Sequence, residues 1–188
     1  IIVGLDSGLH AKQVIDSKGK TLVPGFIDAH VHIESSLLTP KNFQASVLRC
    51  GTTTAICDPH EIANVIGLKG IQYFLEKAEM LDLDLKIMLS SCVPATDFET
   101  NGAGHLRAKD LLPLRAHPKA LGLAEFMNVP GVLNLDPEAL EKIEAFSDSI
   151  IDGHCPLLSG NALSAYAAAG ISSCHEASQF LEASEKIT

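Results

Sequence analysis

The sequence carries little positive charge: 14 lysines and arginines stand against 23 aspartates and glutamates, which gives a formal net charge of −9. Its basic residues form no cluster. Because proteins bind a phosphate backbone through lysine and arginine, this composition argues against a nucleic-acid partner. The sequence also lacks an apolar run close to the ~20 residues that a membrane helix needs, so no membrane partner is expected.

The five cysteines are scattered and form no C-x-x-C pair. This excludes a structural zinc site built from cysteine pairs and indicates reduced, mostly packed thiols in a cytoplasmic protein. The sequence also lacks a dinucleotide-binding glycine fingerprint and the lysine of a phosphate-binding loop. The His-Glu pair at 60–61 is followed by Asn64 where a metalloprotease helix needs its second histidine, and the cytidine-deaminase signature is missing.

What the sequence does contain, from Val23 onward, is a regular alternation of strand-like and helical segments. Strands are expected at Phe26–Val31, Thr52–Cys57, Leu85–Ser90, Ala120–Ala124, Ser149–Asp152 and Gly170–Ser173. Helices are expected near Lys41–Arg49, Ile62–Met80, Ala108–Arg115, Pro137–Phe146, Gly160–Ala169 and Ala177–Lys186. Each unit takes about 30 residues, the size of a βαβ repeat. The alternation predicts parallel strands with right-handed crossovers, in an open sheet or in part of a barrel.

The first residues follow a different pattern, and we expect a fragment of a β-rich domain at 1–23 and a barrel domain at 24–188. Two short apolar runs, at 14–16 and 21–23, flank a polar segment that contains Gly19, which indicates a hairpin. Residues 1–4 have no Met and resemble the middle of a strand. We therefore interpret the chain as a piece of a longer protein.

The predicted strands end in residues that bind metals. His30 and His32 lie two apart on one strand, so their side chains point to the same side. Similar residues stand at later strand ends: His60, Glu125, His154 and His175. Active sites of parallel α/β folds lie at the carboxyl ends of strands, so these side chains should meet at one mouth. Apart from His60, the set contains four imidazoles and one carboxylate, which suit Zn, Fe or Mn, and two ions could share Glu125 with a hydroxide held between them.

Six segments together resemble the adenine deaminases of the amidohydrolase superfamily. They are PGFIDAHVHIESS at 24–36, GTTTAICDPHEIANVIG at 51–67, SSCVPATDFET at 90–100, GLAEFMNVPGV at 122–132, DGHCPLLSG at 152–160 and AYAAAGISSCHE at 165–176. The first is shared widely in the superfamily, whereas the combination of DPHEIANV, SSCVPA and GLAEFMN is far more specific. The resemblance runs from about residue 14 to 180.

The resemblance implies an α/β fold: an eight-stranded (β/α) TIM barrel of the amidohydrolase type, with about six β/α units present here and part of a flanking β-sandwich. It implies hydrolytic deamination of adenine to hypoxanthine and ammonia by a metal-bound hydroxide, a reaction of purine salvage. Two divalent ions (Mn, Fe or Zn) would bind, one at His30 and His32, the other at His154 and His175, with Glu125 as the bridge.

The remaining roles also come from the resemblance. His60 would be a catalytic group that aids proton transfer. The purine substrate would lie against Ser91, Cys92 and Met127, next to Phe126, and a homo-oligomer is expected. The family's general-base aspartate follows the eighth strand and is not in this sequence, so the 188-residue chain alone should be inactive.

Two alternatives remain open from the sequence. One is a different amidohydrolase, such as a cyclic amidase or an N-acetyl sugar phosphate deacetylase. That class often bridges its metals with a carboxylated lysine, and Lys119 lies too early on its strand for this. The other is a metal-binding fragment without catalytic activity.

Overall fold

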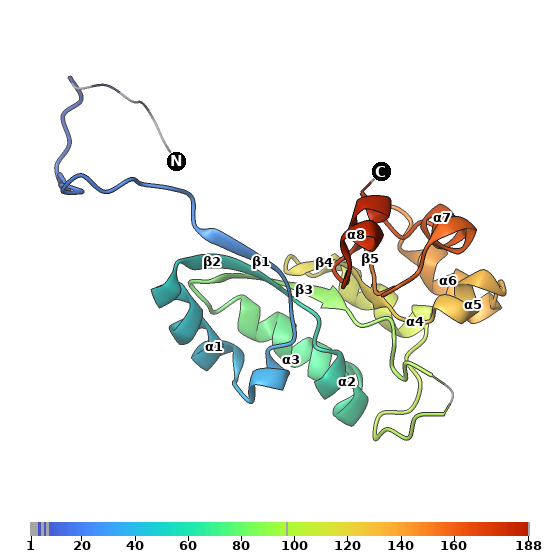
Figure 1. Ribbon diagram of the computed structural model, residues 1–188. Coiled ribbons are helices and arrows are strands. Elements are labelled where there is room, and N and C mark those ends of the chain that lie inside the picture. Colours follow the sequence, from blue (N-terminus) through green and yellow to red (C-terminus); the bar gives the residue numbers. More distant parts are fainter. Residues whose placement is uncertain (1–3, 5, 7, 97, 188) are drawn as a thin grey trace.

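The computed structural model describes residues 4, 6, 8–96 and 98–187. Its centre is one sheet of six parallel strands (Figure 1). The strands are β1 (Phe26–Val31), β2 (Thr52–Cys57), β3 (Asp84–Leu89), β4 (Ala120–Phe126), β5 (Ile150–Gly153) and β6 (Ser173–Cys174). Each pairs with the next one along the chain. A doubly wound sheet reverses its order at a switch point, and these six strands show no reversal. The order is that of a partial (β/α) barrel.

Helices connect the strands. They are α1 (Pro40–Val47), α2 (His60–Ile66), α3 (Leu68–Ala78), α4 (Ala108–Leu111), α5 (Val129–Leu133), α6 (Pro137–Ala145), α7 (Gly160–Ala168) and α8 (Phe180–Lys186). Short 3-10 turns occur at Glu34–Ser36, Leu48–Cys50 and Leu112–Ala116. Helices α1, α2 and α3 lie along one face of the first three strands (Figure 1). Among the described residues, no helix is both long and apolar enough to cross a bilayer.

The hydrophobic core fills the layer between strands and helices. On the strand side, Leu85, Ile87 and Leu89 of β3 are fully buried at alternate positions, as expected for side chains on one face of a strand. On the helix side, α3 contributes a stripe of buried residues spaced by three and four: Ile71, Phe74, Leu75 and Ala78. That spacing places them on one face of the helix. The helix therefore packs this face on the sheet.

The predicted helix over 62–80 is two helices. Gly67, between α2 and α3, has φ 68° and ψ −146°. This backbone conformation is open to glycine and strained for residues with a Cβ, so the chain changes direction here. The apolar pattern continues through Gly67, which is why the sequence predicts a single element.

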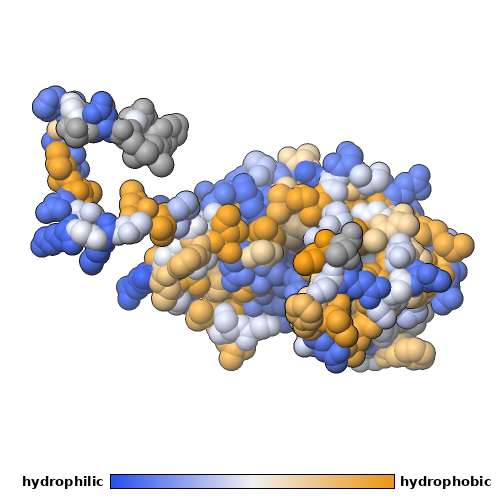
Figure 2. All heavy atoms as spheres, turned by 45° about the horizontal axis from the view of Figure 1, so that its top comes forward, coloured by the Kyte–Doolittle hydropathy of each residue, from blue (hydrophilic) through white to orange (hydrophobic). Residues whose placement is uncertain are grey.

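Residues 8–25 contain a turn and no strand. The Lys20 amide donates to the Ser17 carbonyl oxygen at 3.0 Å, across the predicted turn. Val14 and Leu22 on either side are 81% and 93% exposed, and this segment stands clear of the body (Figure 2). The turn of the predicted hairpin is therefore present, and its strand pairing is not. Most of the strand expected at 1–4 lies outside the described residues.

Candidate metal centre

The histidines and the glutamate expected to bind metal come together at the carboxyl ends of the strands. Within three overlapping groups, the candidate ligand atoms lie within 4.8 Å of one another. The groups are His32, Asp58, His60 and Glu125; His30, Asp152 and His175; and Glu125, His154 and His175. Residues in or shortly after β1, β2, β4, β5 and β6 thus meet at one mouth, although they span most of the chain.

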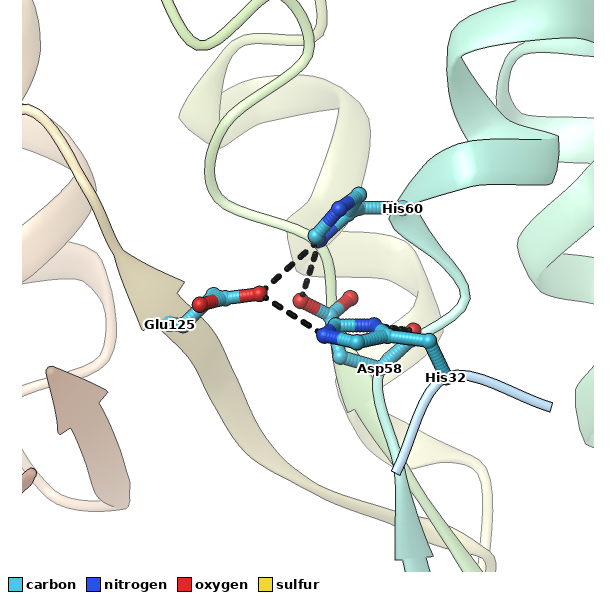
Figure 3. A group of neighbouring side chains, drawn as sticks. All are labelled: His32, Asp58, His60 and Glu125. Carbon is cyan, nitrogen blue, oxygen red and sulfur yellow. Dashed lines mark hydrogen bonds and ion pairs between the residues drawn. The ribbon is translucent and has the colours of Figure 1, made fainter. Parts of the chain in front are cut away.

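Glu125 lies at the middle of this centre, and its two oxygens face different groups. Oε1 lies 3.1 Å from Nε2 of His32 and 3.2 Å from Nδ1 of His60 (Figure 3). Oε2 lies 2.7 Å from Nδ1 of His154 and 3.4 Å from Nε2 of His175. The side chain is only 3% exposed. A carboxylate in this position can bind one cation with each oxygen.

Strand β4 has a local irregularity at Glu125. Leu123 and Phe126, on either side of Ala124 and Glu125, both belong to the hydrophobic core. The register between β4 and β5 shifts between these two residues. Irregularities of this kind are common next to active sites, and Glu125 beside this one faces the histidines.

His30 in β1 and His32 directly after this strand converge as their spacing predicts. Nε2 of His30 and Nε2 of His32 are 2.9 Å apart. Nδ1 of His32 lies 2.8 Å from the carbonyl oxygen of Asp58, and this contact directs Nε2 toward Glu125. Nε2 of His30 lies 3.8 Å from Oε1 of the same carboxylate. Converging imidazole nitrogens around a carboxylate fit Zn, Fe or Mn.

Asp58 is a buried carboxylate behind His60. Its Oδ2 lies 2.9 Å from Nδ1 of His60, and its Oδ1 accepts a hydrogen bond from Oγ of Ser90 at 2.8 Å. His60 thus stands between two carboxylates, Asp58 and Glu125 (Figure 3). Its Nδ1 lies within hydrogen-bond distance of an oxygen of each.

Asp152 has the same arrangement on the other side of Glu125. Its Oδ2 lies 2.8 Å from Nδ1 of His175, and its Oδ1 accepts from Oγ of Ser173 at 2.7 Å. On both sides the serine donates to the aspartate, away from the histidine. Neither set is therefore a nucleophilic triad, in which the serine bonds to the histidine.

Charges in the centre are strongly coupled. Burial opposes ionisation of Glu125, but hydrogen bonds from His175, His32 and His60 outweigh it and hold the pKa of this carboxyl far below its usual range. Burial likewise disfavours the charged form of His60, yet its bonds to Asp58 and Glu125 raise the pKa of the imidazole to about 11. Carboxylates that are ionised and screened from water attract cations strongly.

Sequence reasoning missed Asp58 and Asp152. Each stands in or directly after a buried strand, where an ionisable side chain needs a partner. Asp152 also lies two residues before His154, on the same face of the strand by simple alternation. These signals were present in the sequence, although they do not distinguish a ligand from a residue that supports one.

The residues expected to contact substrate lie beside the centre. Ser91 and Cys92 are buried, and Oγ of Ser91 donates to the backbone oxygen of Glu125 at 2.7 Å. The Met127 amide lies 3.2 Å from Sγ of Cys92. Ser91 and Cys92 line a cavity of about 330 Å³, together with Phe126. Its volume is at the lower end of the range for small-molecule sites.

Comparison with known proteins places this sheet and centre in a family. Residues 21–188 match the model of the amidohydrolase family. The chain belongs to the amidohydrolase family. The amidohydrolases that bridge metals with a modified lysine need that residue in the centre. Here Lys119 precedes β4 and its Nζ contacts Asp84, the first residue of β3, at 3.1 Å. That contact lies at the opposite end of the sheet from Glu125.

Within the amidohydrolases, the chain is similar to several proteins named adenine deaminase. It is 56% identical to adenine deaminase 1 of Agrobacterium fabrum and 56% identical to the adenine deaminase of Gluconobacter oxydans, each over 186 residues. It is 58% identical to an adenine deaminase of Cereibacter sphaeroides over the same length. Each comparison covers 99% of this chain and 32% or 33% of the relative. The chain spans about a third of the length of these relatives.

Proposed function

We propose that the protein containing this chain is an adenine deaminase, a metal-dependent aminohydrolase that converts adenine and water to hypoxanthine and ammonia in purine salvage. The observation that carries the proposal is the 56–58% identity to proteins named adenine deaminase across 99% of the chain. That stretch contains every residue of the centre around Glu125. The centre independently supports hydrolysis assisted by divalent cations.

Two divalent ions, Mn, Fe or Zn, are proposed for this centre. His30 and His32 would hold one ion near Oε1 of Glu125, and His154 and His175 the other near Oε2. Bound cations of this kind lower the pKa of a water molecule and stabilise negative charge on the attacked atom. The position of Glu125 between the two pairs of histidines supports its role as the bridge.

His60 is proposed as the catalytic group that holds and passes a proton. Its Nδ1 faces Asp58 and Glu125, so a proton there is shared with two carboxylates. The purine ring is proposed to lie against the wall formed by Ser91, Cys92 and Met127. The contacts of Ser91 and Cys92 with the backbone oxygen of Glu125 support this placement, because they put this wall next to the bridging carboxylate.

The finer architecture is also a proposal. The whole protein would complete an eight-stranded barrel and a β-sandwich that includes residues 1–23, and the barrel would supply the general-base aspartate. Relatives about three times as long as this chain support this reading. We propose a homo-oligomer in the cytoplasm, with the scattered, unpaired cysteines as the support for that compartment.

The test is ammonia release by the full-length protein loaded with Mn, Fe or Zn. Adenine should be turned over far faster than adenosine, dihydroorotate or an N-acetyl sugar phosphate. Equal turnover of adenosine would make the protein a nucleoside deaminase, and turnover of another control alone would move it to a different branch of the amidohydrolases. The 188-residue chain by itself should release no ammonia.

A further inference from the structure

One carboxylate oxygen stands behind two histidines that are proposed above as ligands of different ions. Oδ2 of Asp152 lies 2.8 Å from Nδ1 of His175 and 3.3 Å from Nδ1 of His30. The other oxygen, Oδ1, accepts the hydroxyl hydrogen of Ser173 at 2.7 Å. Asp152 is buried, and each of its oxygens has a protein donor. Its position is fixed by contacts on both sides.

The same contacts determine where the two imidazoles point. The rings of His30 and His175 are stacked, with centroids 3.5 Å apart and planes 11° apart. With Nδ1 of each ring facing Asp152, Nε2 of each faces Glu125. These Nε2 atoms lie 3.8 Å from Oε1 in the case of His30 and 3.4 Å from Oε2 in the case of His175. The two histidines thus reach different oxygens of the bridging carboxylate from one common support.

We propose that Asp152 is a positioning residue that sets the tautomer and ring orientation of His30 and His175 together. An acceptor at Nδ1 keeps the proton on that nitrogen, which leaves the Nε2 lone pair free to bind a cation. Because the two rings serve different sides of Glu125, one carboxylate orients a ligand of each proposed ion. The inference rests on the proposed function only in requiring that two cations bind here.

Metal affinity tests this role without using turnover. The full-length protein is stripped of metal and titrated with Zn²⁺ against a chromophoric chelator, which resolves two binding steps. Asp152→Ala should weaken both steps, each by roughly the 10–100-fold typical of a lost partner behind a ligand. Asp152→Asn keeps one acceptor oxygen and should weaken both steps less. Asp82→Asn, an exposed aspartate in the turn before β3, is the matched control and should bind as wild type.

A second pair of variants applies if the alanine variant does not fold. Ser173→Ala removes the donor that holds Oδ1 of Asp152, whereas Ser173→Thr retains a hydroxyl. The alanine variant should weaken both binding steps and shift the visible absorption of the Co²⁺-loaded protein, and threonine should restore both. Wild-type affinity in Asp152→Asn and Ser173→Ala would overturn the proposal. Loss of one ion with the other unchanged would also overturn it, because Asp152 would then be a ligand of a single ion.

These outcomes are separate from the fate of the deaminase assignment. If the wild-type protein binds two ions and does not turn over adenine, the adenine deaminase assignment is wrong. The same titration then still tests the role of Asp152. A protein that deaminates adenine, with both titration steps unchanged in the Asp152 variants, would remove the positioning role alone.

Discussion

At Glu125, burial and charge act in opposite directions. A carboxyl that is 3% exposed would resist ionisation, yet the histidines around it keep the pKa of this group far below the usual range. An ionised carboxylate screened from water has to be compensated by nearby positive charge. In this centre, protonated imidazoles or bound cations can supply the positive charge that balances Glu125, because the histidine nitrogens lie around both of its oxygens.

Glu125→Gln should therefore lose metal sharply, because a neutral amide with one oxygen is a poor bridge between two ions. The measurement is elemental analysis of the purified full-length variant, with Glu141→Gln on the exposed face of α6 as the matched control. Unchanged metal content in Glu125→Gln would contradict the bridging role.

His60→Asn should keep both metals and lose rate by about 10²–10⁴-fold, the usual cost of removing a proton-transfer group. The reason is its position between Asp58 and Glu125, outside the two pairs of proposed ligands. Metal content and the rate of ammonia release are measured on the same preparation. The control is His117→Asn, because His117 lies before β4 and its ring pairs with Glu79. Loss of metal along with activity would make His60 a ligand.

At the scale of elements, the sequence was most informative where apolar runs have sharp ends. The predicted limits of β1 and β2 match the structure, because Gly25 and Gly51 precede them and polar residues follow. The last strand was predicted at 170–173 and lies at Ser173–Cys174. Gly170 has φ 112°, so it belongs to the turn after α7. Apolar residues in that turn face the core, and hydrophobicity alone does not distinguish them from a strand.

For the candidate site, too, the sequence predicts one part and leaves another undetermined. The gathering of His and Glu at strand ends was predictable, because parallel strands bring their carboxyl ends to one edge. The role of Asp152 was not, since it depends on which ring nitrogen each histidine turns toward it. The hairpin predicted at 14–16 and 21–23 forms no strand in the described residues, because β-propensity reflects packing against neighbouring strands, which a short pattern does not encode.

Glu182 is one of the side chains that anchor helix α8, and the docking of this helix should depend on pH. Glu182 accepts hydrogen bonds from Lys186, from the Ser178 amide at 3.0 Å and from the Leu157 amide at 2.7 Å. These bonds lower the pKa of Glu182 to about 2 from an ordinary 4.5. Because the pKa of Glu182 is lower in the folded state, its contribution to stability is complete above the unfolded-state pKa. That contribution is lost as the pH falls toward the folded-state pKa.

NMR shifts of the α8 backbone should therefore move toward coil values between pH 4.5 and about 2. In Glu182→Gln the helix should already be loosened at neutral pH, without this acid step, whereas Glu141→Gln should titrate as wild type. An α8 that keeps its helical shifts at neutral pH in Glu182→Gln would contradict the anchoring role.

At the scale of the whole molecule, the sheet has two open sides in the part of the chain that the structure describes. Strands β1 and β6 each pair with one neighbour there. Large apolar side chains are exposed in β1 and just before it: Ile27 is 66% and Val23 62% accessible. Open edges with apolar neighbours favour pairing with another chain.

The 188-residue chain produced alone should therefore self-associate at about 10–100 µM, the concentrations at which exposed edges aggregate. The measurement is static light scattering. Replacing Val23 and Ile27 with lysine should lower the apparent mass, whereas Val65→Lys on the exposed side of α2 should not. A monomeric wild-type chain at these concentrations would contradict the expectation.

The sequential strand order has a consequence for how the molecule is made. A chain that leaves the ribosome amino end first presents each strand after the neighbour on which it docks, so the sheet can grow by addition at one side. The candidate metal ligands of the chain, however, run from His30 on the first strand to His175 after the sixth. The two proposed ions, joined through Glu125, would together act as a staple across nearly the whole chain, of the kind that restricts the unfolded ensemble most. They would also stabilise the folded state in proportion to the logarithm of the free metal concentration. Supply of the metal during synthesis would then decide how much chain reaches the finished fold.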